Sequence, residues 1–391
     1  MNAAGGRHRR SGKRDPNLGR SGRTQAGLDH QTAAGPPARA DDDVLARVEH
    51  LVKYFPVKGG GLIRRTVGHV QAVDDVSLTV GRGQTLGLVG ETGCGKSTLA
   101  RCIAGLIPAT SGTVMFEGQD ITNLPRRQMQ PYRREIQMIF QDPYGSLNPR
   151  RRVGAIIGDA FAIHKLASGE TRRRAVQDLM ERVGLNPEHY NRFPAEFSGG
   201  QRQRIGVARA LALRPKLIIC DEPVSALDVS IQAQVLNLLS DLQDEFGLSY
   251  LFIAHDLEVV RHVSDSVIVM YLGRIAEAGP KDPVYDAPRH PYTAALLSAA
   301  PAADPEAAVR RRRIILTGDV PSPIDPPTGC RFHPRCPKAQ LLCAELEPPL
   351  EAKLGDPVSH VAACHFPVQV GEDLAAAGGQ TPGGQDEHHR A

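Results

Sequence analysis

The sequence contains no apolar run that approaches the roughly eighteen residues needed for a membrane-spanning helix. Its first residues include Arg and Gly but lack the apolar core of a secretory signal. The net charge of +4 is too small to indicate a nucleic-acid partner by itself. We therefore expect a cytoplasmic protein without a specific nucleic-acid partner, which acts at a membrane only through other subunits.

The composition is that of a globular chain with two low-complexity ends. Of the 391 residues, 41% are hydrophobic and 23% are charged, which is ordinary for a soluble protein of more than one domain. Residues 1–43 are rich in Gly, Arg, Ala and Pro, so we expect a disordered basic tail, and residues 371–391 also have the composition of a disordered tail. Between them we expect one domain over 44–280 and a smaller Pro-rich, loop-rich domain over 281–370.

Apolar strands and helical segments alternate in the first domain, which predicts an α/β fold. Residues from about 142 to 210 are expected to be mostly helical, since Val176, Met180 and Val183 recur on one helix face. A helix is also predicted at Leu99–Leu106. Strands are predicted in the segment Val44–Val80, at Thr85–Val89, Leu217–Cys220 and Tyr250–Ala254, and as a hairpin at Ser266–Met270 and Arg274–Ala278.

A glycine-rich loop links the strand Thr85–Val89 to the helix after it. It fits the pattern G-x4-G-K-[ST] in full, with Gly90, Glu91, Thr92, Gly93, Cys94, Gly95, Lys96 and Ser97, and Thr98 follows as a further expected nucleotide contact. The backbone N–H groups of such a loop wrap phosphates, and the helix N-terminus attracts them. Lys96 is expected to reach the β- and γ-phosphates and Ser97 to bind Mg²⁺. A fortuitous glycine-rich turn is the alternative, but the strand and helix on either side favour a nucleotide.

Two carboxylates end a second buried strand. Asp221 and Glu222 follow the apolar run Leu217–Cys220, at the end of a strand where a parallel sheet places its ligand chemistry. Asp221 suits Mg²⁺, usually through water, and Glu222 suits the activation of an attacking water. A solvated acidic turn is the alternative, and the glycine-rich loop upstream makes it the weaker one.

A second helix N-terminus has the form of an anion site. Ser198 is a good N-cap, and Gly199, Gly200 and Gln201 leave backbone N–H groups open. The alternative is a capped helix without a ligand. Because one nucleotide does not need two phosphate sites in the same chain, we expect the second site to serve the nucleotide of another subunit.

Together these segments resemble the ATPases of ABC transporters, in which two subunits meet head to tail with two ATP molecules between them. The resemblance implies a P-loop core with antiparallel β and helical subdomains. It also implies that Gln141 contacts Mg²⁺ and the transmembrane partner, and that His255 contacts the γ-phosphate. Lys96, Glu222 and His255 would then form the catalytic set.

The same resemblance assigns two further positions. The run Ser225–Asp228 matches the loop that crosses the dimer interface, which marks Asp228 as an interface residue. Phe55 or Tyr54 matches the aromatic residue that stacks on adenine, and the spacing favours Phe55.

The subfamily resembled is that of oligopeptide/dipeptide importers, which includes nickel-transporting relatives. The matching segments are Asp142–Pro149, directly after Gln141, and His290–Thr293. Such importers imply a second, related ATPase subunit, two permeases and an extracytoplasmic binding protein. The chain would then lie at the cytoplasmic face of the membrane, held there by the permeases.

Four cysteines gather near the end of the chain, at Cys330, Cys336, Cys343 and Cys364. Four thiolates complete either a zinc site or an iron–sulfur cluster. No close C-x2-4-C pair is present, which argues against structural zinc, and importers with this type of tail resemble carriers of a [4Fe–4S] cluster. Buried cysteines without metal are the remaining alternative.

Other ATPase classes fit the sequence less well. Chromosome-maintenance ATPases insert a long coiled coil between the glycine-rich loop and the second helix site, whereas Lys96 and Ser198 are only about a hundred residues apart without heptads. Ribosome-associated relatives usually carry two cassettes, and this chain has one. A subunit that binds ATP without hydrolysing it would not need both Glu222 and His255.

Overall fold

The structure is a computed structural model that describes residues 43–59, 65–142, 145–300 and 313–377. Residues 1–42 of the first expected tail and 378–391 of the second lie outside these residues, whereas 371–377 of the second are described, and there the expectation of disorder is wrong, because Leu374 is buried in the short helix α12 (Leu374–Ala377). Pro143 and Tyr144 of the subfamily segment also lie outside them.

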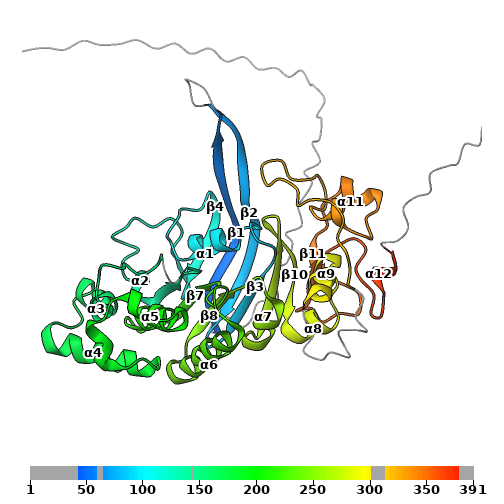
Figure 1. The fold of residues 1–391 in the computed structure, drawn as a ribbon. Helices are drawn as coiled ribbons and strands as arrows, with labels where there is room; N and C mark the ends of the chain where they lie inside the picture. Colours follow the sequence, from blue (N-terminus) through cyan, green and yellow to red (C-terminus); the bar gives the residue numbers. More distant parts are fainter. Residues whose placement is uncertain (1–42, 60–64, 143–144, 301–312, 378–391) are drawn as a thin grey trace, which may run out of the picture. The chain divides into compact units, whose positions relative to one another are not determined.

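Eight strands form one mixed sheet in the order β11-β12-β10-β9-β3-β8-β7-β6 (Figure 1). The pairs between β6 and β9 in this order are parallel, and the pairs from β9 to β11 are antiparallel. The strands are β3 (Thr85–Val89), β6 (Ile136–Ile139), β7 (Leu217–Asp221), β8 (Ser249–Ile253), β9 (Ser266–Tyr271), β10 (Arg274–Pro280), β11 (Leu350–Ala352) and β12 (Val361–Ala363). The expected α/β class and the hairpin of β9 and β10 are confirmed.

Successive residues of the central strands enter two different hydrophobic cores. In β7, Ile218 and Cys220 pack into one core, while Leu217 and Ile219 pack into the other. Side chains of a strand point alternately to its two faces, so the sheet lies between two apolar layers. This explains why the central strands are continuous apolar runs and not alternating ones.

A second, antiparallel sheet covers one of these faces, in the order β2-β1-β4-β5. Its strands are β1 (Val44–Lys58), β2 (Thr66–Gly81), β4 (Ser111–Phe116) and β5 (Gln119–Asp120). Leu51 and Val73 of this sheet share a core with Leu99 of α1 and with Ile219 of the large sheet. The long β1–β2 hairpin is seen in Figure 1.

Most helices pack on the opposite face. The helical segment expected between about 142 and 210 contains α3, α4 and α5, which share the other core with Ile218 and Cys220. The longer helices are α1 (Lys96–Ile103), α3 (Val153–Ile163), α4 (Gly169–Arg182), α5 (Gly199–Leu211), α6 (Val229–Phe246), α7 (Leu257–Val263) and α9 (Pro291–Ala299). The shorter ones are α2 (Tyr132–Glu135), α8 (Lys281–Asp286), α11 (Leu341–Glu345) and α12 (Leu374–Ala377). Over the described residues, no helix has the length and apolar character to cross a membrane.

The chain after Pro280 is built onto the large sheet. Strand β12 pairs antiparallel with β10, and β11 pairs with β12, so this segment extends the sheet at its β10 edge. Phe332 and Tyr292 lie in the same core as the helices, and the centroids of their rings are 5.3 Å apart. The cysteine-containing segment is therefore packed against β9 and β10, and β9 is the neighbour of β3, which leads into the glycine-rich loop.

Candidate nucleotide site

The glycine-rich loop has the backbone shape that a phosphate cradle requires. It leaves the end of β3 and enters α1 at Lys96. Gly95, at the N-cap of α1, has φ of 112°, and a Cβ there would lie 1.9 Å from the carbonyl oxygen of Ala72. Gly93 has φ of 83° and an open space beside it. Only glycine adopts this backbone without strain, so the loop can turn its N–H groups toward one point.

Lys96 lies folded into the loop. Its side chain is buried, and Nζ donates hydrogen bonds to the carbonyl oxygens of Gly90 at 2.7 Å and Glu91 at 3.0 Å. An ammonium group held in this way lies beside the space that the loop encloses. It can exchange these carbonyl contacts for phosphate oxygens when a nucleotide binds.

Two oxygen ligands suited to Mg²⁺ meet below the loop. The hydroxyl of Ser97 donates to Oδ1 of Asp221 at 2.7 Å, which joins the start of α1 to the end of β7. Burial raises the pKa of Asp221, and the hydrogen bond from Ser97 acts against that rise. A hydroxyl and a carboxylate in contact are the ligands that Mg²⁺ prefers, so these residues fit the ion.

Three polar side chains meet at the ends of neighbouring strands. Nε2 of Gln141 donates to Oε2 of Glu222 at 2.8 Å, and Nδ1 of His255 lies 3.4 Å from the same oxygen. Glu222 has a φ of 49°, a left-handed backbone that a non-glycine residue seldom adopts. The strained turn after β7 aims this carboxylate at the Gln141 amide and the His255 ring, which is typical of a functional residue.

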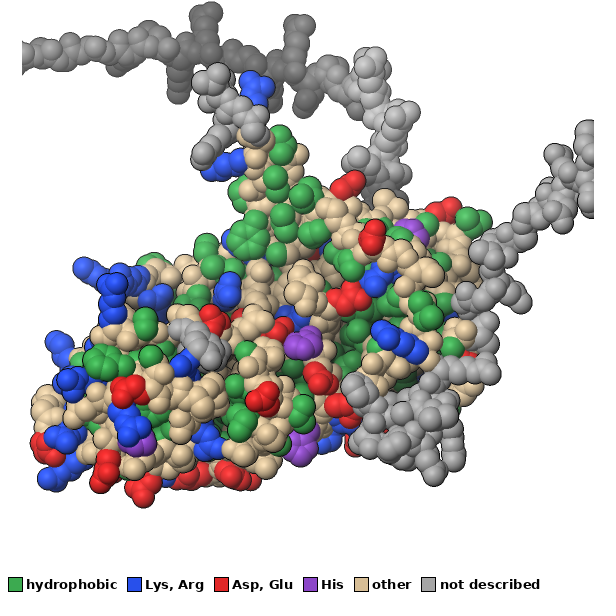
Figure 2. All heavy atoms as spheres, in the orientation of Figure 1, with side chains coloured by type: hydrophobic (Ala, Val, Ile, Leu, Met, Phe, Trp, Pro, Cys, Tyr) green, Lys and Arg blue, Asp and Glu red, His purple; other side chains and the backbone are tan. Residues whose placement is uncertain are grey.

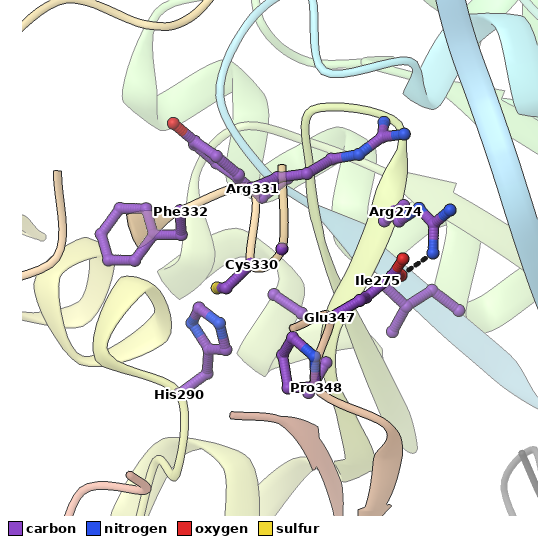
Figure 3. A pocket seen from close by; sticks show the side chains of 12 residues that line it. Arg274, Ile275, His290, Cys330, Arg331, Phe332, Glu347 and Pro348 are labelled. Carbon is purple, nitrogen blue, oxygen red and sulfur yellow. Dashed lines mark ion pairs between the residues drawn. The ribbon is translucent and has the colours of Figure 1, made fainter. Parts of the chain in front are cut away.

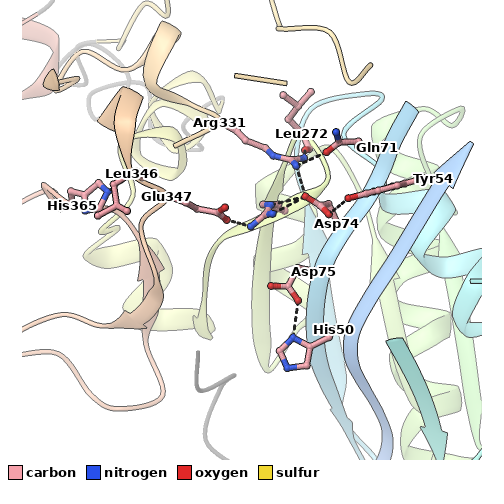
Figure 4. Close-up of polar contacts among 11 residues, drawn as sticks. His50, Tyr54, Gln71, Asp74, Asp75, Leu272, Arg331, Leu346, Glu347 and His365 are labelled. Carbon is pink, nitrogen blue, oxygen red and sulfur yellow. Dashed lines mark hydrogen bonds and ion pairs between the residues drawn. The ribbon is translucent and has the colours of Figure 1, made fainter. Parts of the chain in front are cut away.

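The two candidate aromatic residues differ in their surroundings. Tyr54 donates its hydroxyl to Asp74, a contact shown in Figure 4, and its pKa is raised to about 12 by burial and this hydrogen bond. Phe55 is 38% exposed, and Nζ of Lys53 lies 4.8 Å from its ring centroid. The Phe55 side chain is therefore exposed while the Tyr54 hydroxyl is bonded within the chain, and which of the two stacks on adenine stays a prediction.

Ser198 caps α5 as expected. Its hydroxyl accepts from the N–H of Gln201 at 3.3 Å, and Oε1 of Gln201 accepts from the N–H of Ser198 at 3.0 Å. Among the described residues, no hydrogen bond joins this helix start to the glycine-rich loop. Asp228 is exposed at the start of α6.

The four clustered cysteines line one small cavity, together with Phe332, His333, His365 and Phe366. Burial raises the pKa of Cys336 to about 12 and that of Cys364 to about 11. Over the described residues, no three His, Cys, Asp or Glu side chains are arranged to hold a metal ion. The structure therefore gathers the four cysteines without bringing them to one ion-sized point.

Two arginines that the sequence did not indicate, together with Tyr292 of the subfamily segment, contact the site from the C-terminal segment. Arg331 and Arg335, in the loop between Cys330 and Cys336, form ion pairs with Asp74 and Glu91. The hydroxyl of Tyr292 accepts from the N–H of Glu91 at 2.9 Å. No local pattern marks these partners, because Arg335 and Glu91 are 244 residues apart.

The sequence matches two families of known proteins. Residues 73–225 match the family described as ABC transporter, and residues 276–343 match the oligopeptide/dipeptide transporter C-terminal region. The chain is 53% identical over 328 residues to the oligopeptide transport ATP-binding protein AppF of Bacillus subtilis, covering 84% of this chain and 98% of that protein. It is 51% identical to the dipeptide transport ATP-binding protein DppF of Escherichia coli, covering 78% of this chain and 91% of the relative.

Solved structures show the same fold. The dimeric ATP-binding cassette MJ0796, bound to ADP and Pi, aligns with a TM-score of 0.54 at 26% identity over 61% of this chain and 99% of that one. The chain therefore belongs to the family of ABC transporter ATP-binding proteins. More narrowly, it belongs to the members that carry the oligopeptide/dipeptide transporter C-terminal region.

Proposed function

We propose that this chain is the ATP-binding and ATP-hydrolysing subunit that powers an ABC importer of oligopeptides or dipeptides. The observation that carries the proposal is the meeting of Ser97 with Asp221, beside the group of Gln141, Glu222 and His255. The named functions of its relatives AppF and DppF supply the cargo class. A nickel importer of the same family is the second candidate, and a non-transport ABC ATPase is the third.

The residues divide the work of hydrolysis between them. The loop Gly90–Ser97, with Thr98, holds the phosphates, and Lys96 neutralises the β- and γ-phosphates. Ser97, Gln141 and Asp221 would hold Mg²⁺, which supplies charge neutralisation on the phosphate oxygens when bound. Glu222 takes the proton of the attacking water, and His255 fixes the water and the γ-phosphate. Phe55, with Tyr54 as the alternative, stacks on the adenine.

The second helix start serves a neighbouring ATPase subunit. Ser198, Gly199, Gly200 and Gln201 form an anion site that no hydrogen bond of the described chain links to its own glycine-rich loop. In a head-to-tail dimer, this site closes on the nucleotide of the partner, and Asp228 lies at the interface. The partner is a second, related ATPase subunit. The dimeric state of the MJ0796 cassette supports this arrangement.

We propose that a permease binds in a groove beside Gln141. It is lined in part by Phe140, Arg151, Asp159 and Arg209 and lies between β6 and the helices. Figure 2 shows Lys and Arg side chains gathered over the part of this face that holds α2, α3 and α4. An acidic or amphipathic permease segment suits such a groove. Two permeases and an extracytoplasmic binding protein complete the importer, with this chain at the cytoplasmic face of the membrane.

We also propose that the four clustered cysteines hold a [4Fe–4S] cluster within the domain 281–370. The support is that Cys330, Cys336, Cys343 and Cys364 all line one cavity. Four thiolates are the ligand set of such a cluster, and its separate irons do not require the ligands to meet at one ion.

The test is purification of the assembled complex under anaerobic conditions. The proposal predicts ATP hydrolysis that rises when the binding protein is loaded with peptide, and iron with acid-labile sulfide in the same sample. Stimulation by nickel and not by peptide would favour the second candidate. Failure to co-purify with integral-membrane subunits would favour the third, and a colourless sample without iron or sulfide would overturn the cluster.

A further inference from the structure

The C-terminal segment contacts the glycine-rich loop at Glu91, inside the phosphate cradle. Nη1 and Nη2 of Arg335 donate to the two carboxylate oxygens of Glu91 at 2.9 and 3.1 Å. The Arg335 side chain is 10% exposed and lies over the Tyr271 ring, with 5.9 Å between Cζ and the centroid. A planar guanidinium group that binds both oxygens fixes direction as well as distance.

Glu91 is also held through its backbone. Its N–H donates to the hydroxyl of Tyr292, and its carbonyl oxygen accepts from Nζ of Lys96. The C-terminal segment thus binds both the carboxylate and the backbone N–H of Glu91, while Lys96 binds its carbonyl oxygen. A shift of Glu91 therefore moves the carbonyl that holds Lys96, and Lys96 is the residue that must meet the phosphates.

A second contact runs from the same loop to the β1–β2 hairpin, which carries Tyr54 and Phe55. Arg331 donates to Asp74, to the side chain of Gln71 at 2.8 Å and to the carbonyl of Leu272, as Figure 4 shows. Asp74 in turn accepts from the hydroxyl of Tyr54. Tyr54 is the chain neighbour of Phe55, so this network fixes the strand that presents the Phe55 ring.

The charges of this second network are balanced, and its central pair, Arg331 and Asp74, is largely buried. Arg274 donates to Asp74 at 2.9 Å and forms an ion pair with Glu347, which Figure 3 draws among the residues that line a pocket. The side chains of Arg331 and Asp74 are 10% and 8% exposed. Loss of the Arg331 charge would leave Asp74 with Arg274 and the Tyr54 hydroxyl as its partners, and would weaken the hold of this network on Tyr54.

Backbone hydrogen bonds also connect the Arg331 network with the glycine-rich loop that Arg335 contacts. Gly273 donates its N–H to the carbonyl of Cys94 at 2.9 Å, and its own carbonyl accepts from the N–H of Asp74 at 2.9 Å. Arg331 binds the carbonyl of Leu272, the residue before Gly273. The turn between β9 and β10 thus joins the Arg331 network to the glycine-rich loop.

We propose that Arg331 and Arg335 are positioning residues of the nucleotide site, Arg335 for the phosphate loop through Glu91 and Arg331 for the adenine-stacking strand through Asp74 and Tyr54. This inference rests on the proposed ATP binding of the chain. It makes the loop between Cys330 and Cys336 a working part of the ATPase site and not only an appendage to it.

The test measures nucleotide binding by the full chain at a temperature well below unfolding. The probes are a fluorescent ATP analogue with Mg²⁺ and, as its competitor, inorganic triphosphate, which occupies the phosphate loop without an adenine. Arg335→Gln should weaken the binding of both probes about tenfold, because the misplaced loop serves both. Arg331→Gln should weaken the ATP analogue about as much and leave triphosphate nearly unchanged.

The matched control is Arg289→Gln. Arg289 forms a similarly buried ion pair with Asp356, at 12% and 6% exposure, in the same C-terminal segment. This control should lower thermal stability without changing either affinity. Arg335→Lys should recover part of the binding, and Glu91→Gln combined with Arg335→Gln should weaken binding no more than either change alone.

Two outcomes would overturn the inference. If Arg331→Gln and Arg335→Gln only lower the melting temperature, as Arg289→Gln does, with unchanged affinities, both arginines are merely structural. If Arg331→Gln weakens triphosphate as much as the ATP analogue, the assignment of Arg331 to the adenine side is wrong. Failure of the wild-type chain to bind the analogue in a Lys96-dependent way would overturn the proposed function itself, and the inference with it.

Discussion

At the scale of single residues, Glu222 separates ATP binding from ATP turnover. Glu222→Gln keeps the size of the side chain and its contact with Gln141, which is 2.8 Å long in the native chain. Because an amide cannot accept the proton of the attacking water, turnover should fall by about a hundredfold or more. ATP should still bind, since Lys96 and the glycine-rich loop are unchanged. Single-turnover hydrolysis and equilibrium ATP binding by the assembled complex measure the two effects separately.

The ATP site that contains the partner's glycine-rich loop must not hydrolyse ATP in this comparison. We would inactivate the partner ATPase first, so that the only hydrolysis observed comes from the site with Glu222. A wild-type rate from the Glu222→Gln complex under these conditions would contradict the role of Glu222 as general base. Glu181→Gln is a suitable control, because it makes the same chemical change at an exposed position of α4.

Whether a residue of the site could be predicted from the sequence depends on how far away its partners lie along the chain. Lys96, Ser97, Asp221 and Glu222 were predictable because each stands in a local pattern, a loop or a strand end, with its own chemical meaning. The partner of Arg335 was not predictable, since a surface arginine and one that fixes Glu91 look alike in sequence. Burial and pairing decide that difference, and both are properties of the folded chain.

At the scale of elements, His290 makes helix α9 sensitive to acid. Its Nδ1 accepts from the N–H of Tyr292 at 3.1 Å and caps the helix. Burial and the charge of Lys353 lower the pKa of His290 to about 3, below its ordinary value of 6.5. Between these values the unfolded chain binds a proton that the folded chain does not. The free energy of unfolding should therefore fall with pH below about 6.5, at up to about 1.4 kcal/mol per pH unit from this residue.

His290→Asn is the matched variant for this prediction. Asparagine caps helices but does not titrate, so the variant should lose the His290 part of the pH dependence. Urea unfolding of both chains at about pH 7 and about pH 5 measures the difference, with carboxylates contributing equally to each. Equal pH dependence of the two chains would show that His290 is protonated at no cost in the folded state.

The elements themselves were largely predictable, and their neighbours were not. The strands β3, β7, β8 and the β9–β10 hairpin follow from short apolar runs, because a strand buried on both faces has no polar position. That β12 pairs with β10 did not follow from the sequence. Its three residues, Val361–Ala363, are too short to carry a signal, and tertiary packing selects their partner.

At the scale of the whole molecule, we propose that the chain carries two halves of two different ATP sites. Lys96, Ser97, Asp221 and Glu222 form one half, and Ser198–Gln201 forms the other. On this proposal, ATP is hydrolysed only when a partner subunit closes over it, and hydrolysis drives the opening and closing of the dimer.

The most direct measurement of this claim uses Lys96→Ala in the assembled complex. This variant removes the chain's own ATP half-site, so that the remaining ATP is held and hydrolysed at the partner's P-loop. Ser198→Arg added to Lys96→Ala should abolish that remaining ATP retention and turnover, whereas Ser168→Arg, at the exposed N-cap of α4, should not. If the complex with Lys96→Ala alone and the complex with Lys96→Ala and Ser198→Arg retain and hydrolyse ATP equally, Ser198 does not contribute to the partner's ATP site and the proposal of a shared site is wrong.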